Sequence, residues 1–211
     1  MFGSEVVLMV LLYHITHVNN LRSILQNDGL LAQVIVQKNQ QSYKDVANAD
    51  IQSRRSRTRI PKGPCGNLHD YVPFYFAPRS PMLYSVCHQG GIPQDEMIYF
   101  MTDTDTVQRL ELPFVFTDAH AIMMFTNFYD DLADLDKVDW EVMNAVVWRD
   151  DNDHPNRKSK RQAEFLIHEK VPLAACIGLA VKNERMKIQV QEILNDVNIR
   201  LPIGIRGNFY F

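Results

Sequence analysis

The run Arg157-Lys158-Ser159-Lys160-Arg161-Gln162-Ala163-Glu164-Phe165-Leu166-Ile167 changes abruptly from basic to apolar. Its apolar end is short and rich in aromatic and branched residues, which predicts a buried strand. The cations before it predict a solvated loop. Glu164 therefore stands at the mouth of a strand, beside a cationic segment that faces water. Two interpretations remain open on this pattern: a carboxylate that meets a charged substrate, or a gatekeeper charge at a strand edge.

The length and composition predict an ordinary globular chain. With 211 residues it fits one domain with a substantial core, and we expect a single domain over residues 1–211. The net charge of -3 argues against a surface that binds nucleic acid all round, but the basic residues are clustered, so a local patch stays open. The three cysteines are far apart and lack metal-ligand spacing, which predicts no metal site and a reducing compartment, the cytoplasm.

The first apolar run, residues 6–12, is too short to cross a membrane. It has no basic leader and no small-residue cleavage site, so we expect a buried strand over about residues 6–15 and no signal peptide. No other run approaches the length of a membrane span, which predicts no membrane association. His14 and Thr16 fall on one side of this strand near its end. A lone histidine there is most often a satisfied core residue, whereas a polar pair favours a ligand.

Residues 36–62 are polar and lack hydrophobic periodicity, which predicts a surface loop with a short helix near residues 50–57. The segment ends with a cluster of cations, Arg54, Arg55, Arg57, Arg59 and Lys62. Such a cluster can simply keep a surface solvated. It can also hold phosphates, because guanidinium groups make bidentate contacts with them.

Residues 72–77 predict a strand that ends at Pro78, with Ser80 capping a following helix. The aromatic density from Tyr71 to Tyr84 exceeds what a small strand needs for packing. An aromatic wall for a planar ligand and an aromatic core explain it equally well.

The remaining pattern mixes strands and helices without regular alternation. Strands are expected over residues 96–102, 114–116, 176–181 and 208–211, and helices over 20–27, 104–110, 119–129, 133–144 and 184–197. This order favours an α+β fold over a doubly wound sheet. The sequence has neither a Gly-x-Gly-x-x-Gly nor a Walker-type phosphate loop, so a dinucleotide would have to bind without a Rossmann fingerprint.

Four ordered motifs carry a resemblance to a known family. They are Tyr-His-Ile-Thr-His at 13–17, Asp-Tyr-Val-Pro-Phe-Tyr-Phe-Ala-Pro-Arg-Ser-Pro-Met at 70–82, Phe-Val-Phe-Thr-Asp-x-His-Ala at 114–121 and Arg-Gln-Ala-Glu-Phe-Leu at 161–166. The first, second and fourth resemble the motifs of His-Tyr-Glu ADP-ribosyltransferases. Together the four resemble DarT, a family of bacterial toxins that ADP-ribosylate a base in single-stranded DNA. The resemblance covers nearly the whole chain and implies an ADP-ribosyltransferase-like fold with a split central sheet flanked by helices.

The resemblance also implies an NAD co-substrate and a set of site residues. Glu164 would stabilise the positive charge that builds on the ribose as nicotinamide leaves. His14, Ile15 and Thr16 would bind the adenosine side of NAD, and Tyr75 and Tyr84 would face the nicotinamide. Arg54 and Arg55 would contact the pyrophosphate or help deprotonate the base, with Arg54 and Arg55 competing for one role. His120 is a candidate for positioning the acceptor base.

The acceptor implied by the resemblance is single-stranded DNA, with thymine as the preferred base and guanine as an alternative. Arg157, Lys158, Lys160 and Arg161 would follow the DNA backbone, and Tyr71 and Phe74 would stack bases. A macrodomain antitoxin of the DarG type, which removes the mark, is the implied protein partner. An acceptor in RNA or protein stays open. A non-catalytic NAD- or nucleic-acid-binding module also stays open, although the presence of Glu164 argues against it.

Overall fold

The computed structural model describes residues 9–40, 43–44, 46 and 48–211. The strands are β1 (Leu11–His17), β2 (Gly29–Leu31), β3 (Tyr71–Tyr75), β4 (Met97–Asp103), β5 (Phe114–His120), β6 (Phe128–Tyr129), β7 (Ala163–His168), β8 (Lys170–Pro172), β9 (Gly178–Val181) and β10 (Ile203–Ile205). The α-helices are α1 (Leu21–Gln26), α2 (Gln33–Lys38), α3 (Ala49–Arg55), α4 (Pro81–His88), α5 (Thr104–Arg109), α6 (Trp140–Asn144), α7 (Arg157–Lys160) and α8 (Glu184–Asp196). Short 3-10 helices are η1 (Val18–Asn20), η2 (Leu68–Asp70), η3 (Gln94–Glu96), η4 (Leu132–Lys137), η5 (Leu173–Ala175) and η6 (Gly207–Phe209).

Eight strands form the central sheet in the order β10-β9-β4-β1-β3-β7-β5-β6, and β2 pairs with β8 in a second, small sheet. Strands β9 and β10 run parallel, and every other pair in the described part of the sheet is antiparallel. Strand β1 pairs with β4 over its whole length, but it meets β3 only at Tyr13 and Tyr75. The central sheet is therefore split at its middle, where β1 and β3 diverge.

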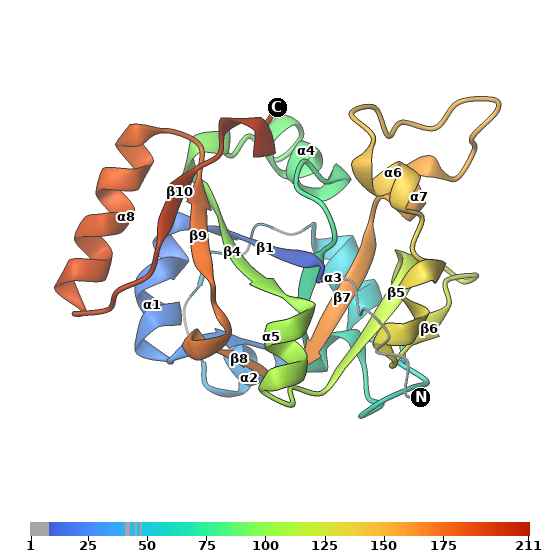
Figure 1. The fold of residues 1–211 in the computed structure, drawn as a ribbon, viewed down its shortest axis with the longest axis horizontal. Helices are drawn as coiled ribbons and strands as arrows, with labels where there is room; N and C mark the ends of the chain where they lie inside the picture. Colours follow the sequence, from blue (N-terminus) through green and yellow to red (C-terminus); the bar gives the residue numbers. More distant parts are fainter. Residues whose placement is uncertain (1–8, 41–42, 45, 47) are drawn as a thin grey trace, which may run out of the picture.

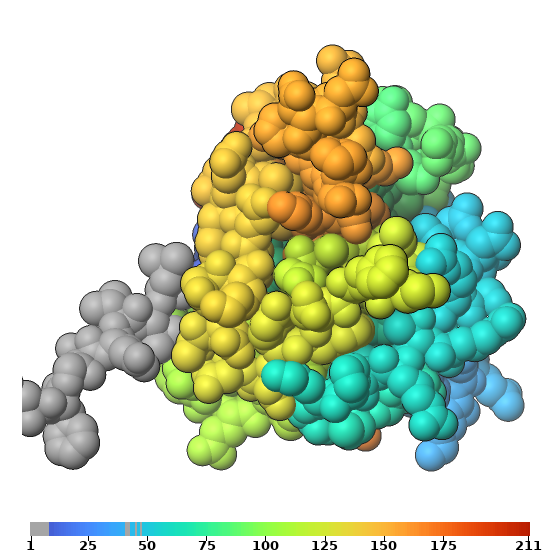
Figure 2. All heavy atoms as spheres, turned by 90° about the vertical axis from the view of Figure 1, so that its right-hand side faces the viewer, coloured from blue at the N-terminus to red at the C-terminus, as the bar shows by residue number. Residues whose placement is uncertain are grey.

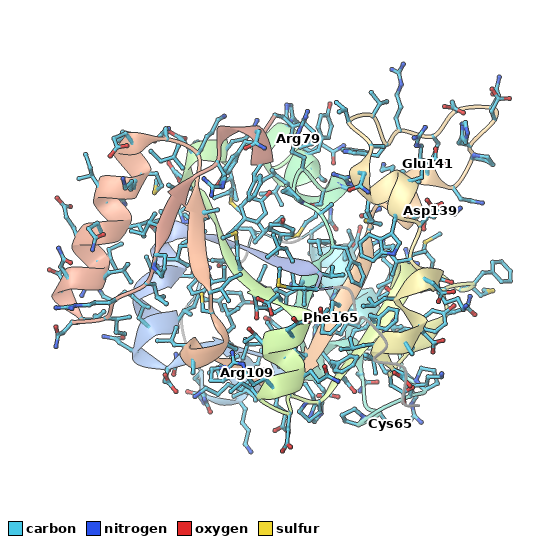
Figure 3. The ribbon with its side chains drawn as sticks, viewed as in Figure 1. Cys65, Arg79, Arg109, Asp139, Glu141 and Phe165 are labelled. Atoms are coloured by element: carbon cyan, nitrogen blue, oxygen red, sulfur yellow. The ribbon has the colours of Figure 1, made fainter. Side chains whose placement is uncertain are left out.

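Alternating side chains give the sheet two buried faces. On one face Leu12, Phe100 and Phe165 belong to the largest cluster of buried hydrophobic residues. On the other face Tyr13, Tyr75 and Tyr99 form a second cluster, and Leu166 lies in a third. Since neighbours on a strand alternate, Glu164 lies on the same face as Leu166 and on the opposite face from Phe165. Figure 3 shows Phe165 near the centre of the fold.

The helices cover the two ends of the sheet (Figure 1). Helices α1 and α8 lie side by side at one end, where Arg22 makes an ion pair with Asp196 at 2.6 Å. Helices α6 and α7 lie at the other end, beside β7 and β5. Helix α4 begins after Ser80, whose hydroxyl accepts a hydrogen bond from the Leu83 amide at 3.2 Å, as expected for a helix cap.

The α+β class and the split sheet flanked by helices are confirmed, but several element boundaries were wrong. Residues 157–161 were expected to form a loop, but Arg157–Lys160 form α7. The helix expected over 119–129 is the end of β5, a turn and β6. The last strand expected over 208–211 is η6, and β10 precedes it. The first strand ends at His17 rather than at residue 15, and residues 6–8 of the predicted strand lie outside the described residues.

A β-bulge explains why the end of β5 was predicted to be helical. The strand is irregular between Phe116 and His120, where its register against β7 shifts. Such a bulge breaks the alternation that sequence patterns depend on.

In the described part of the chain, no helix combines the length and the apolar character that crossing a bilayer requires.

Candidate active site

Glu164 is the centre of the site and is completely buried. One carboxylate oxygen, Oε2, accepts a hydrogen bond from Arg55 Nη1 at 2.7 Å. The other, Oε1, accepts one from the Ala121 amide at 3.3 Å and lies 3.9 Å from His120 Nε2. Glu164 lies at the start of β7, as expected, but the expectation that it faces water there was wrong. Its register opposite Tyr75 carries it into the sheet, where charged and backbone donors stabilise it.

Helix α3 delivers the arginine that pairs with Glu164. The Asn48 side chain caps the helix by accepting hydrogen bonds from the amides of Asp50 at 2.9 Å and Ile51 at 3.4 Å. Arg55, in the last turn, is buried and reaches Glu164, whereas Arg54 donates to the Ile122 carbonyl at 3.0 Å. The second terminal nitrogen of Arg55, Nη2, is buried and has no hydrogen-bond partner among the described residues. A ligand oxygen would supply that missing partner.

His120 lies at the end of β5, between the cavity and Glu164. Its side chain is 12% exposed, and burial lowers its pKa below the ordinary value of 6.5, although the nearby carboxylate of Glu164 opposes the shift. The imidazole is therefore predominantly neutral near pH 7 and offers one donor and one acceptor nitrogen. This placement beside Glu164 is compatible with the predicted role of His120 in positioning the acceptor base, which stays a prediction.

His14 and Thr16 line the cavity where β1 leaves β3. The Nδ1 atom of His14 is 2.8 Å from the Pro73 carbonyl of β3, so it donates to that oxygen and leaves Nε2 as an acceptor. Burial lowers the pKa of His14 to about 4, which keeps the ring neutral. The Thr16 hydroxyl accepts a hydrogen bond from Asn20 Nδ2 at 3.1 Å. Ile15 also lines the cavity.

Two tyrosines, Tyr75 and Tyr84, also contribute to the cavity wall. Tyr75 is buried, and burial followed by the negative charge of Glu164 raises its pKa above the ordinary value of 10.0. Tyr84 on α4 is 42% exposed, and its ring stacks on His88 with the ring centres 4.1 Å apart. Trp148 and Phe211 meet Tyr84 edge-on, at 6.3 and 5.4 Å. Of the two interpretations of the aromatic stretch, the core holds for Phe74 and Phe76, whereas Tyr84 forms an aromatic wall with rings from outside the stretch.

These residues surround one large cavity of about 890 Å³. Of the predicted site residues, its walls include His14, Ile15, Thr16, Arg54, Arg55, Tyr71, Tyr75, Tyr84, His120 and Lys158. Glu164 lies one layer behind this wall, shielded by Arg55, Tyr75 and His120. The volume is in the range of pockets that take cofactor-sized ligands.

The cations at 157–161 do not act as one group. Arg161 was predicted to contact DNA, but it is 5% exposed and its guanidinium donates to carbonyls of Pro78, Val142, Met143 and Ala145. Arg161 therefore connects the C-terminal end of α6 to the loop after β3. The predicted DNA contact was wrong because the guanidinium is buried and makes its hydrogen bonds within the protein. Lys160 pairs with Asp139 at 2.8 Å, and Arg157 lies 4.0 Å from Glu141. Figure 3 labels both acids, which lie at α6.

Lys158 differs from its neighbours because its side chain is exposed, lines the cavity and makes no ion pair among the described residues. Of the predicted stacking residues, Tyr71 lines the cavity but is only 1% exposed, and its hydroxyl donates to the Cys65 carbonyl at 2.7 Å. Phe74 is buried in the main core, so the prediction that it stacks a base was wrong.

Several residues of the site were not predicted from the sequence. The Ala121 amide contacts Glu164, and Thr117 Oγ1 accepts a hydrogen bond from the Glu164 amide at 2.9 Å. Both residues fall inside the motif at 114–121, so the motif carried that signal. The wall formed by residues 146–149 belongs to an irregular segment without periodicity, and no local sequence pattern indicates it.

Among the described residues, no group of three or more His, Cys, Asp or Glu side chains could hold a metal ion.

Comparison with known proteins places this geometry in a family. The family model described as "ssDNA thymidine ADP-ribosyltransferase, DarT" matches residues 13–211. A DNA ADP-ribosyl transferase of Thermus sp. (strain 2.9) is 39% identical over 207 residues, which cover 95% of each chain. A Thermosipho africanus protein, a DNA ADP-ribosyl transferase-DNA ADP-ribosyl glycohydrolase fusion, is 27% identical, and the match covers 95% of this chain and 49% of the fusion.

Two solved structures of Thermus sp. 2.9 DarT share the fold. The structure in complex with ADP-ribosylated single-stranded DNA matches with a TM-score of 0.87 and 38% identity, and the match covers 96% of both chains. The structure in complex with NAD+ matches with a TM-score of 0.83 and 35% identity, covering 96% of this chain and 98% of the other. The chain therefore belongs to the DarT family of single-stranded-DNA thymidine ADP-ribosyltransferases.

Proposed function

We propose that this chain, acting as one domain, transfers ADP-ribose from NAD to a thymine base of single-stranded DNA and releases nicotinamide. The observation that carries the proposal is the buried pair of Arg55 and Glu164 behind the wall of an 890 Å³ cavity. Replacing a buried ion pair by well-packed apolar residues is often neutral or stabilising, so a contribution to stability does not by itself explain the presence of this pair. Membership of the DarT family and the NAD+ complex of a 35% identical relative support the same reaction.

The cavity suits NAD at several points. The acceptor nitrogen of neutral His14 is available to a ribose hydroxyl, and Thr16 lies two residues along the same strand. Arg54 donates one hydrogen bond to the Ile122 carbonyl, and its other guanidinium N–H groups can bind the pyrophosphate. Tyr75 and Tyr84 provide aromatic surface for the nicotinamide ring.

Glu164 supplies the charge that the reaction needs. Breaking the bond between nicotinamide and ribose builds positive charge on the sugar, and a fixed carboxylate near the 2′-hydroxyl stabilises it. Because Arg55 Nη1 now covers one oxygen of Glu164, we propose that Arg55 moves toward the substrate as it binds and uncovers the carboxylate. The Ala121 amide holds the other oxygen and fixes the orientation.

The acceptor nitrogen of thymine carries a proton that must leave for the nitrogen to attack. Glu164 is the candidate general base, and Arg55 would stabilise the negative charge that develops on the base. His120 is the candidate for positioning the base, because it lies between the cavity and Glu164. Only a base that has left a duplex stack reaches such a recessed site without the cost of unstacking, about a few kcal/mol.

Lys158 is the cation that we propose for the DNA backbone, since Arg161 is buried and Lys160 is paired with Asp139. A macrodomain antitoxin that removes the mark is the proposed partner, and both would act in the cytoplasm, where the DNA is. The support for this pairing is the Thermosipho africanus relative, in which a transferase is fused to a DNA ADP-ribosyl glycohydrolase.

Mass spectrometry of short oligonucleotides incubated with the protein and NAD tests the proposal. We expect a mass increase of one ADP-ribose on thymine-containing single strands and little on duplexes of the same sequence. Modification of a thymine-free strand alone, or equal modification of duplex and single strand, would contradict it. Labelling of RNA or of protein while DNA stays bare would assign the other acceptor.

A further inference from the structure

The turn between β5 and β6 exposes two large apolar side chains at its tip. Phe125 is 91% exposed and Met124 is 89% exposed, more than any other large hydrophobic residue in the described part of the chain. In Figure 2 the yellow-green atoms of this segment stand out from the face of the molecule. A phenyl ring carries about 150–250 Å² of mostly apolar surface, so leaving it in water favours binding to a partner.

The turn that carries these side chains is held firmly from both ends. The Met123 amide and the Thr126 hydroxyl both donate to the His120 carbonyl, at 3.0 and 2.8 Å. Asn127 is bound to Asp118 twice, through its amide at 3.0 Å and through its side chain at 2.7 Å. The exposure of Phe125 is therefore a property of an ordered turn.

The same turn is bonded to the proposed reaction centre. Its first residue, Ala121, donates to Glu164, and the carbonyl of the next, Ile122, accepts from Arg54. Ile122 and Met123 line the cavity, as do Val146 and Val147, both of which are exposed. Since consecutive Cα atoms are about 3.8 Å apart, the Cα of Phe125 lies within about 7.6 Å of that of Met123. The tip is thus continuous with the cavity wall.

We propose that Phe125, with Met124 beside it, is a stacking platform for the base next to the acceptor base; this inference rests on the proposed function. A strand that turns one base into the cavity leaves the neighbouring base unstacked at the mouth. An exposed aromatic ring replaces that lost stacking, whatever the base, because every base has a π face. Cationic Lys158 and Arg149 line the same cavity and suit a polyanion better than an apolar protein surface.

The test combines a change in the protein with a change in the DNA. Oligonucleotides with a single thymine are prepared intact and with an abasic site on its 5′ or its 3′ side, and kcat/KM for ADP-ribosylation is measured. We expect F125A to lower kcat/KM about tenfold on the intact strand, the size of one base–aromatic contact. We expect one abasic site to lower the wild-type value by a similar factor and to cause no further loss in F125A. F125W should restore activity.

The surface variant I188A, on the far helix α8, is the matched control and should behave as the wild type, since Ile188 is 55% exposed and lies outside the cavity wall. Equal losses for F125A on intact and abasic strands would show a structural effect and overturn the inference, as would no loss at all.

A binding measurement separates this inference from the proposed function. Trp140 and Trp148 fluoresce in every variant, and Trp148 lines the cavity, so each signal is compared with that of the wild type. The fluorescence that F125W adds to the wild-type signal should be quenched by single-stranded DNA, and the fluorescence that I188W adds should not. If the wild type modified no oligonucleotide, the proposed function would fall, while the fluorescence of F125W would still decide whether the tip binds a base. Quenching that depends on protein concentration without DNA would assign the tip to self-association and overturn the inference.

Discussion

The guanidinium of Arg55 lies 2.7 Å from the carboxylate of Glu164, and both side chains are buried. The pair joins the last turn of α3 to the start of β7, which are 109 residues apart in the chain. Removing either partner would leave an unpaired charge away from water, which costs about 3–5 kcal/mol of folding free energy. Substitutions at this pair therefore have to be chosen so that loss of activity is distinguished from loss of stability.

Glu164→Gln is expected to lower ADP-ribosyl transfer by at least about a hundredfold while the protein stays folded. The amide keeps a similar shape and an acceptor oxygen for the Ala121 amide, but it lacks the negative charge that stabilises the ribose cation. Glu164→Ala should lose the same activity and in addition a large part of its stability. Transfer rates and thermal unfolding of the two variants provide the measurement, and near-normal transfer in Glu164→Gln would contradict the assignment.

Arg55→Ala is expected to reduce transfer far more than Arg59→Ala. Arg55 is buried against Glu164, whereas Arg59 is exposed, and an exposed surface substitution usually changes the free energy of unfolding by less than about 0.5 kcal/mol. Arg55→Lys keeps the charge but lacks the forked guanidinium, so only partial recovery of transfer is expected. Equal, small losses in Arg55→Ala and Arg59→Ala would mean that the cluster only keeps the surface solvated.

The sequence predicted the members of this site better than their surroundings. His14, Tyr75 and Glu164 were found because the motifs that contain them are contiguous, and the structure brings them to one cavity or directly behind it. The sequence could not show which of Arg54 and Arg55 pairs with Glu164. Neighbours on a helix point about 100° apart, and only the packing of α3 determines which of the two faces the carboxylate.

Burial was the property that the sequence concealed. Glu164 and Arg161 are charged residues next to a basic run, a pattern typical of a surface, yet they are 0% and 5% exposed. Their partners lie in segments distant along the chain, the Glu164 partner on α3 and the Arg161 partners near residues 78 and 142–145. Long-range pairing of this kind leaves no local periodicity to detect.

The stability of the protein should decrease as the pH falls from about 6.5 to about 4. The pKa of His14 is lowered to about 4 in the folded protein, so over this interval the unfolded chain binds a proton that the folded one does not. The contribution is at most about 3 kcal/mol. Urea unfolding at several pH values should show a shallower dependence in His14→Asn than in the wild type. An unchanged slope in His14→Asn would contradict the prediction.

Lys158→Ala is expected to weaken binding of single-stranded DNA at low salt and to reduce its salt dependence. If Lys158 neutralises one phosphate, the slope of log K against log salt should fall in magnitude by about 0.7. Lys187→Ala, on α8 and outside the cavity wall, is the control and should keep the wild-type slope. Fluorescence anisotropy of a labelled strand at several salt concentrations gives both values, and identical slopes for all three proteins would exclude a phosphate contact at Lys158.

Alanine substitution should destabilise the protein far more at Arg161 than at Lys160, although the two residues are adjacent in the sequence. Arg161 donates to carbonyls of the last turn of α6 and to the Pro78 carbonyl, so Arg161→Ala leaves several buried acceptors without partners and should lower the free energy of unfolding by more than about 3 kcal/mol. Lys160 makes a half-exposed ion pair with Asp139, and Lys160→Ala should cost less than about 1 kcal/mol. Chemical denaturation of both variants gives the two values. Arg161 also donates to the Ala145 carbonyl, which directly precedes the cavity wall at residues 146–149, so Arg161→Lys should raise KM for NAD or DNA more than it lowers kcat. Similar stabilities for Arg161→Ala and Lys160→Ala would show that the carbonyl contacts of Arg161 do not secure this segment.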